Sequence, residues 1–156
     1  VHDVREAIPD ISLSTDIIIG FPGETEEDFQ GTLDVVKEVG YGQMFRFIYS
    51  KRPGTPAATI VDDMPREVLQ ERFERLECLA QESSLAENEH EIGKTIPVLV
   101  EGVSKRDAGI LAGKSPKLQT VHAQLADGMR IDDVIGSIMA VHVDSATTNY
   151  LQGTLV

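Results

Sequence analysis

Residues 14–29, which read STDIIIGFPGETEEDF, constrain the fold of this chain more than any other stretch. Residues 16–19 (DIII) form a run that is too short for a typical helix and too uniformly apolar for a half-exposed strand, which indicates a buried, parallel strand. The glycines and proline of residues 20–23 then break the chain, because glycine tolerates positive φ and proline fixes its own φ. Thr25 and Asp28 have the spacing of a capping box, so a helix should begin at about Glu26.

The loop at residues 20–24 is the first candidate site. In a parallel α/β sheet, the loop that leaves the carboxyl end of a strand is where ligands bind, since the strand holds it and the following helix offers unpaired amides. A Gly-Pro-Gly turn is not specific to ligand binding, however. A plain connection between strand and helix remains the alternative for this stretch taken alone.

A helix and a second strand follow. Phe29, Leu33 and Val36 recur on one helical face, and Gly40 supplies a left-handed end. Residues 43–50 (QMFRFIYS) then alternate as a strand does. Strand, helix and strand in this order predict a βαβ unit with parallel strands and a right-handed crossover. The alternation divides the second strand into two faces, one with Phe45, Phe47 and Tyr49 and the other with Met44, Arg46 and Ile48.

Residues 51–56 (KRPGTP) leave the second strand at its carboxyl end. Two cations on a rigid turn suit contact with an anion or substrate, and an ordinary polar turn is the alternative. A long amphipathic helix should follow Pro65 and end near Glu91, before Gly93. Its predicted buried stripe is Leu69, Phe73, Leu76 and Ala80, its predicted charged exterior is Glu71, Arg72, Glu74, Arg75 and Glu77, and the lone Cys78 is predicted to be a packed thiol on its flank.

The net charge of −12 is unevenly distributed along the chain. Residues 1–91 hold 8 Lys and Arg against 20 Asp and Glu, whereas residues 92–156 hold 6 of each. Four cations of the second part lie close together in sequence, where they form either a solvated surface or a patch that faces phosphates. They are Lys105, Arg106, Lys114 and Lys117.

The period changes from helical to alternating at Lys94, which predicts a second domain. Pro97 in its first strand indicates a hydrogen-bonding partner on one side only. About five short strands in residues 92–156 suit a small closed barrel, a shape often used to bind oligonucleotides. The further predicted strands are residues 110–111, 121–125, 138–143 and 151–156.

No run of apolar residues is long enough to span a membrane, and the first residues lack the order of a signal peptide. A single cysteine fits a reducing cytoplasm. The opening residues read as the tail of a helix that Pro9 stops, so we expect the chain to be part of a longer protein.

Taken in order, STDIIIGFPGETEEDF, FIYSKRPGTPAA, PREVLQERFERL and VLVEG resemble the carboxyl half of a radical-SAM tRNA methylthiotransferase, which adds a methylthio group to isopentenyladenosine beside the anticodon. The resemblance implies an α/β fold in which residues 1–91 are the end of a radical-SAM (β/α) barrel and residues 92–156 are a small all-β, OB-like TRAM domain that grips tRNA. A relative that acts on a ribosomal-protein aspartate usually has an acidic pair where this chain has residues 51–55 (KRPGT), and this difference favours the tRNA enzyme.

The resemblance also implies cofactors. Such enzymes use S-adenosylmethionine and two 4Fe-4S clusters held by two sets of three cysteines, whereas this chain has only Cys78. We therefore expect no cluster on this chain and no catalytic residue within it. By analogy with the family, the residues expected near S-adenosylmethionine are Asp16, Ile18, Gly20, Phe21, Pro22 and Gly23, and for Asp16 a pairing role inside the barrel is an equal alternative.

The resemblance places Ser50, Arg52 and Thr55 at the substrate mouth and assigns the tRNA grip to Lys105, Arg106, Lys114 and Lys117. His122 is a further candidate, although a lone histidine in a strand is more often structural. Tyr150 is the only Phe, Tyr or Trp residue of the second domain, so binding should be mainly electrostatic and sensitive to salt.

Three alternatives remain from the sequence. The parent enzyme could act on threonylcarbamoyladenosine or on a ribosomal protein, or the chain could be a freestanding RNA-binding or protein-interaction module. An open partial barrel could also pair with a second copy through its exposed sheet edge.

Overall fold

The computed structural model describes residues 1–61, 64–105, 107–125 and 128–156. The chain divides into two compact units, residues 1–83 and residues 84–156, and each is described here by itself. The long helix α3 (Arg66–Glu89) begins in the first unit and ends in the second. Among the described helices, none has the length and hydropathy that a membrane span requires.

The first unit is built on two parallel strands, β1 (Ser14–Ile19) and β2 (Gln43–Ile48), which pair in register from Ser14 opposite Gln43 to Ile19 opposite Ile48. The helix α2 (Glu26–Val39) connects them, so the predicted βαβ unit is confirmed. The remaining elements of this unit are α1 (His2–Ala7), the short 3₁₀ helix η1 (Pro56–Thr59) and the first part of α3.

The ends of α2 follow local sequence chemistry. Thr25 is the N-cap: its hydroxyl accepts from the backbone N–H of Asp28, and the Asp28 carboxylate accepts from the backbone N–H of Thr25, which completes the predicted capping box. Gly40 ends the helix in the left-handed region at φ 59°. Both predicted boundaries of this helix are therefore confirmed.

Helices α2 and α3 pack on the same face of the β1–β2 sheet. The shared core consists of Ile19, Phe29, Leu33, Val36, Met44, Leu76 and Ala80. The opposite face is uncovered within this unit, where Ile18, Phe45 and Phe47 are 55%, 48% and 51% exposed. Because the side chains of paired residues in parallel strands point the same way, Ile18 and Phe47 lie side by side on that face.

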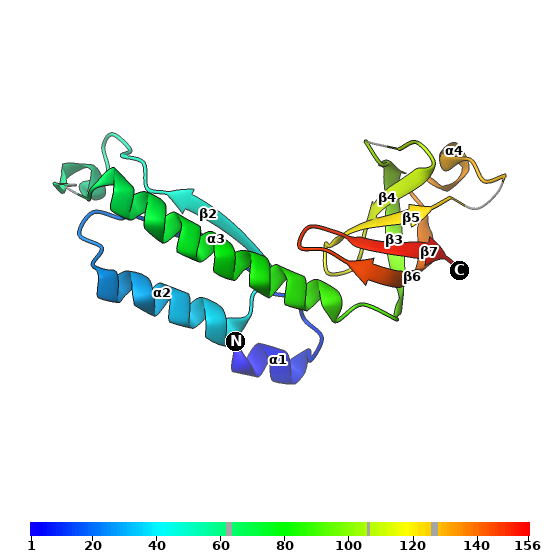
Figure 1. The fold of residues 1–156 in the computed structure, drawn as a ribbon, viewed down its shortest axis with the longest axis horizontal. Coiled ribbons are helices and arrows are strands. Elements are labelled where there is room, and N and C mark those ends of the chain that lie inside the picture. The colour runs from blue at the N-terminus through cyan, green and yellow to red at the C-terminus, as the bar shows by residue number, and fades with distance from the viewer. Residues whose placement is uncertain (62–63, 106, 126–127) are drawn as a thin grey trace. The chain divides into compact units, whose positions relative to one another are not determined.

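The second unit contains a closed barrel of five strands in the order β3-β4-β5-β7-β6, in which β6 returns to pair with β3 (Figure 1). Alternate residues point inward, and the interior is filled by ten buried apolar side chains from Ile96 to Leu151. The predicted small β-barrel is therefore confirmed. Its strands are β3 (Thr95–Val103), β4 (Ile110–Lys114), β5 (Thr120–Gln124), β6 (Ile138–Ala146) and β7 (Leu151–Leu155).

Pro97 lies in the part of β3 that pairs only with β6, since the pairing with β4 begins at Leu99. The sequence interpretation of this proline is thus confirmed, because a residue without an N–H can be tolerated where one ladder is missing. A short helix, α4 (Ile131–Val134), precedes β6 and was not expected from the sequence.

Two predictions for α3 are wrong. Arg72, assigned to the charged exterior, is only 4% exposed. Cys78, expected to be a packed thiol, is exposed, and its Sγ lies 3.7 Å from Glu82 Oε1. The buried face of the helix passes through residues 69, 72, 76 and 80, so residue 72 lies on it and residue 78 lies on the opposite side.

The capping box predicts how stability should depend on pH. Hydrogen bonds from the hydroxyl and then from the backbone N–H of Thr25 hold the pKa of Asp28 below its ordinary value. A carboxyl whose pKa is lowered by folding adds stability above its unfolded pKa, and this is lost as the pH falls through the folded pKa. Urea unfolding of Thr25→Ala should therefore show lower stability at pH 7 and a smaller further loss between about pH 5 and 3. Thr25→Ser, which keeps the hydroxyl, should retain the wild-type profile; an unchanged profile in Thr25→Ala would contradict the assignment.

Candidate cofactor loop and nucleic-acid groove

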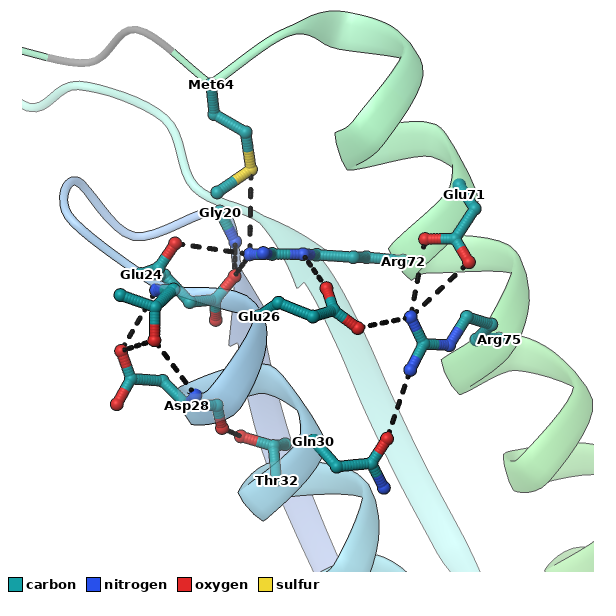
Figure 2. Close-up of polar contacts among 11 residues, drawn as sticks. Gly20, Glu24, Glu26, Asp28, Gln30, Thr32, Met64, Glu71, Arg72 and Arg75 are labelled. Carbon is teal, nitrogen blue, oxygen red and sulfur yellow. Dashed lines mark hydrogen bonds and ion pairs between the residues drawn. The ribbon is translucent and has the colours of Figure 1, made fainter.

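The loop between β1 and α2 is held by its own polar groups. The Gly20 N–H donates to Glu24 Oε2 at 3.0 Å (Figure 2). The Glu24 N–H donates to the Phe21 carbonyl at 2.8 Å. Gly20 has φ 72°, a conformation that suits glycine. The N–H of Gly20, a residue expected near S-adenosylmethionine, thus donates to Glu24 in this structure.

Arg72 anchors the same loop from α3. Its Nη1 donates to Glu24 Oε2 at 2.8 Å and to the Glu24 carbonyl at 3.3 Å, and its Nε donates to Glu26 Oε2 at 3.1 Å (Figure 2). The side chains of Arg72 and Glu24 are 5% and 11% exposed, so this ion pair is largely removed from water. The loop and the start of α2 are therefore tied to α3 through one buried guanidinium.

Arg75, one turn further along α3, extends the network toward solvent. Its Nη1 lies 2.6 Å from Glu26 Oε1, and the guanidinium lies 4.9 Å from the centre of the Phe29 ring. The hydrogen bond from Arg75, followed by the charges of Arg75 and Arg72, holds the pKa of Glu26 below its ordinary value. Glu26 is thus kept ionised between two arginines.

The uncovered sheet face continues onto this loop as an apolar surface. The Phe21 ring meets the Tyr49 ring edge to face, with their centres 5.2 Å apart. Phe21 is 47% exposed, and the exposed Ile18 and Asp16 lie on the adjoining strand. Flat rings, an aliphatic side chain and one carboxylate have the chemical character to contact a planar ring that carries polar groups, as adenine does, so these residues are compatible with part of an S-adenosylmethionine site.

The second predicted loop leaves the same end of the sheet. Tyr49 N–H donates to the Ile19 carbonyl at 2.9 Å, which joins the carboxyl ends of the two strands. Beyond it, Ser50, Arg52 and Thr55 are exposed, and the Thr55 hydroxyl donates to the Arg52 carbonyl at 2.8 Å. The structure therefore brings residues 20–24 and residues 50–55 to one rim of the first unit.

The residues do not fit an iron-sulfur cluster. Cys78 is the only cysteine in the sequence, and no three His, Cys, Asp or Glu side chains among the described residues are arranged to hold a metal ion. No chemical step can be assigned through a cluster on the residues of this chain.

The barrel carries a groove of about 1110 Å³ on its outer surface. Outward residues of β4, β5 and β7 form its floor, among them Ala112, His122 and Gln152, which are neighbours in adjacent strands. The β3–β4 loop contributes Lys105, and Tyr150 comes from the β6–β7 connection. Five-stranded OB-type barrels bind oligonucleotides on this face and with these two loops.

The predicted cations have different environments. Lys105 lines the groove, whereas Arg106 lies outside the described residues. Lys114 Nζ donates to the Thr120 hydroxyl at 2.9 Å. Lys117, only 15% exposed, lies 2.7 Å from Glu91 Oε1, and the Glu91 side chain is 5% exposed. Of the three described cations, only Lys105 lines the groove, and Lys117 forms an ion pair that supports the barrel.

Sequence reasoning missed Glu24 and Arg72 as a pair and did not connect His122 with Tyr150. The helical spacing did contain a signal for Arg72, since residue 72 lies four positions before Leu76 and eight before Ala80 on the buried face. No local pattern connects His122 with Tyr150, because only the parallel pairing of β5 with β7 brings these segments together.

Comparison with known families decides the nature of the second unit. Residues 89–156 match the model of the TRAM domain. The chain carries a TRAM domain. The five-stranded barrel with its groove is therefore the structure of this TRAM domain, and residues 84–88 at the end of α3 belong to the same compact unit.

Relatives match the remainder of the chain together with the TRAM domain. The tRNA-2-methylthio-N(6)-dimethylallyladenosine synthase of Lachnoclostridium phytofermentans is 44% identical over 156 residues, which is 100% of this chain and 33% of that protein. The synthases of Sphingopyxis alaskensis and Francisella philomiragia are 47% and 41% identical over 97% and 100% of this chain and over 33% and 34% of their own lengths. The chain is a homologue of these synthases and spans about a third of their length.

Proposed function

We propose that this chain is the carboxyl-terminal part of a tRNA methylthiotransferase that modifies isopentenyladenosine beside the anticodon. The observation that carries the proposal is identity of 41–47% to synthases of that name over nearly the whole chain, including the loop and the TRAM domain. The names of the relatives favour this nucleoside over threonylcarbamoyladenosine or a ribosomal protein.

On this proposal, residues 1–91 complete a radical-SAM barrel and residues 92–156 are the TRAM domain. The parallel β1–β2 pair, with helices on one face and an open apolar face, suits the last strands of such a barrel. S-adenosylmethionine and two 4Fe-4S clusters would supply the radical and sulfur chemistry in the parent. We expect a cytoplasmic protein.

The residues of this chain would bind and orient the cofactor and the substrate. Ile18, Phe21 and the backbone of residues 20–23 would line the adenine, and Asp16 would contact a polar group of the cofactor. Pro22 removes one backbone donor from the loop and stiffens it. Ser50, Arg52 and Thr55, on the same rim, would face the substrate, where arginine suits phosphate or base edges. The TRAM domain would hold the tRNA.

The proposal is tested by expressing the full-length protein that contains this chain in a bacterial strain whose tRNA lacks methylthio groups. Nucleoside mass spectrometry should show conversion of isopentenyladenosine to its 2-methylthio form. Methylthio groups on threonylcarbamoyladenosine alone would establish the alternative nucleoside. Unmodified tRNA, from a protein that binds S-adenosylmethionine and iron, would overturn the proposal.

A freestanding RNA-binding module remains the second candidate, and the TRAM domain is the observation that favours it. The nucleoside assay separates the two, since a module without the remaining domains would leave the tRNA unmodified. Self-association through the open β1–β2 edge stays a prediction, and sedimentation of the 156-residue chain measures it.

A further inference from the structure

The TRAM groove differs from a typical phosphate-binding surface in its charge. Its described lining includes the carboxylates of Glu101, Asp107 and Asp144 but only one ammonium group, that of Lys105. Carboxylates repel the phosphates of an RNA backbone, and phosphate binding by proteins relies on clustered Lys and Arg. The described surface of the groove is thus poorly suited to following the backbone of a nucleic acid.

The same groove is well suited to bases. The rings of His122 and Tyr150 meet edge to face, with centres 5.1 Å apart and planes inclined by 82°. Both line the groove, so a flat ligand in it meets an aromatic surface. Nδ1 of His122 is buried and has no hydrogen-bond partner among the described residues, so the ring surface, and not this nitrogen, is what a base in the groove can contact.

Hydrogen bonds hold the backbone of Tyr150. Its N–H donates to the Thr147 hydroxyl at 3.1 Å, and the Thr147 N–H donates to the Tyr150 carbonyl at 2.9 Å. The Thr147 carbonyl accepts from Asn88 Nδ2 at 2.7 Å, and Asn88 is 6% exposed. A ring on a loop that is already ordered loses little conformational entropy when a base stacks on it.

Polar side chains around the rings match the edges of bases. Gln124, Gln152 and Asn149 carry amides that both donate and accept hydrogen bonds, and carboxylates accept from the exocyclic amino group of cytosine. Asp144 Oδ2 already accepts from the Thr154 hydroxyl at 2.7 Å, which orients that carboxylate at the edge of the groove.

We propose that the groove of the TRAM domain binds unpaired nucleobases, which stack on His122 and Tyr150 while the phosphates remain outside it. This inference rests on the proposed function, in which the TRAM domain holds RNA. It replaces the expectation of a mainly electrostatic grip with recognition of bases in a single-stranded segment. Duplex RNA, whose bases are stacked and paired, does not offer them to such a groove.

The first test compares three RNA ligands of equal length on the 156-residue chain. They are a single strand, the same strand in which abasic sugars replace the central bases, and a duplex. Fluorescence anisotropy should give at least tenfold tighter binding of the intact single strand than of the other two. The logarithm of its affinity should fall with the logarithm of the salt concentration with a slope shallower than about −2. Equal affinity for the intact and abasic strands would overturn the proposal without any variant.

The second test uses matched variants. Tyr150→Leu should weaken binding of the single strand about tenfold, and Tyr150→Phe, which keeps the ring, should stay within about twofold of wild type. Ile138→Ala, at a 70% exposed position of the same barrel outside the groove lining, is the control and should not change affinity. Unchanged binding by a folded Tyr150→Leu variant would exclude the stacking role; if that variant does not fold, the abasic comparison decides.

The outcomes also separate this inference from the proposed function. If the full-length protein methylthiolates tRNA but the 156-residue chain binds intact and abasic strands equally, the proposed enzyme function is supported and base binding by the groove is rejected. If binding depends on the bases but tRNA is not methylthiolated, base binding by the groove is supported and the proposed enzyme function is rejected. If the chain binds none of the three RNAs, base binding by the groove is rejected. The nucleoside assay then tests the proposed enzyme function by itself.

Discussion

Replacing Arg72 with methionine is expected to lower the free energy of unfolding of the first unit by about 3–5 kcal/mol. Methionine can fill much of the volume of the arginine stem, but it leaves Glu24 at 11% exposure without its cation. The cost of a buried, unpaired carboxylate exceeds the modest net value of the pair itself, which is why removing one partner destabilises so strongly. The Gly20–Glu24 hydrogen bond should weaken as well, because the Glu24 carboxylate would rotate toward water.

Urea unfolding and hydrogen exchange of residues 17–25 measure this effect. Arg75→Met is the matched control, since Arg75 also pairs with Glu26 and lies over Phe29, but it is 33% exposed and has no hydrogen bond to residues 20–24. It should cost less than about 1 kcal/mol, as exposed ion pairs do. Adding Glu24→Gln to Arg72→Met should recover part of the loss. Equal effects of the two arginine variants would show that the loop does not depend on Arg72.

Replacing Gly153 with alanine is expected to destabilise the TRAM barrel by about 3 kcal/mol. A Cβ atom at this position would collide with the carbonyl oxygen of His142 and lie 2.6 Å from Val141 Cγ1. Gly153 pairs with Val143 of β6 and with Ala123 of β5, so the barrel can relieve the collision only by separating strands. That separation breaks ladder hydrogen bonds and opens the packed interior.

Gly102→Ala provides the control, because Gly102 also lies in a strand of this barrel and, apart from its chain neighbours, no described residue has an atom within 4 Å of the added Cβ. Thermal unfolding should show a large decrease in Tm for Gly153→Ala and a small change for Gly102→Ala. A similar decrease for both would mean that loss of glycine flexibility, and not the collision with His142, controls the stability of the barrel.

Much of the local structure was predictable from short segments. The capping box at Thr25, the left-handed end at Gly40 and the alternation of the barrel strands each depend on chemistry within a few residues. These features appear in the structure as expected, because each depends on contacts between residues that are close in sequence and therefore does not depend on the rest of the fold. The same kind of local signal predicted the two loops, residues 20–24 and 50–55, that meet at one rim of the first unit.

The residues buried beneath α3 in the first unit were only partly predictable. Helical spacing indicated a buried stripe on α3 and placed residue 72 in line with it. It could not show that the charge of Arg72 would be buried, since that burial depends on Glu24 and Glu26, which lie 48 and 46 positions earlier in the chain. An isolated arginine is normally placed at the surface because desolvating a cation is costly. Only the tertiary structure supplies the carboxylates that offset this cost.

For the TRAM domain, the sequence by itself determined five alternating strands and their turns, because strand period and turn chemistry are local properties. Only the tertiary structure decided that β5 lies parallel to β7, so that His122 meets Tyr150 in the groove while Lys117 is paired with Glu91. Residues far apart in sequence become neighbours because the barrel buries its apolar core. The hydrophobic effect that drives this burial is non-directional, so no short segment specifies which strands pair.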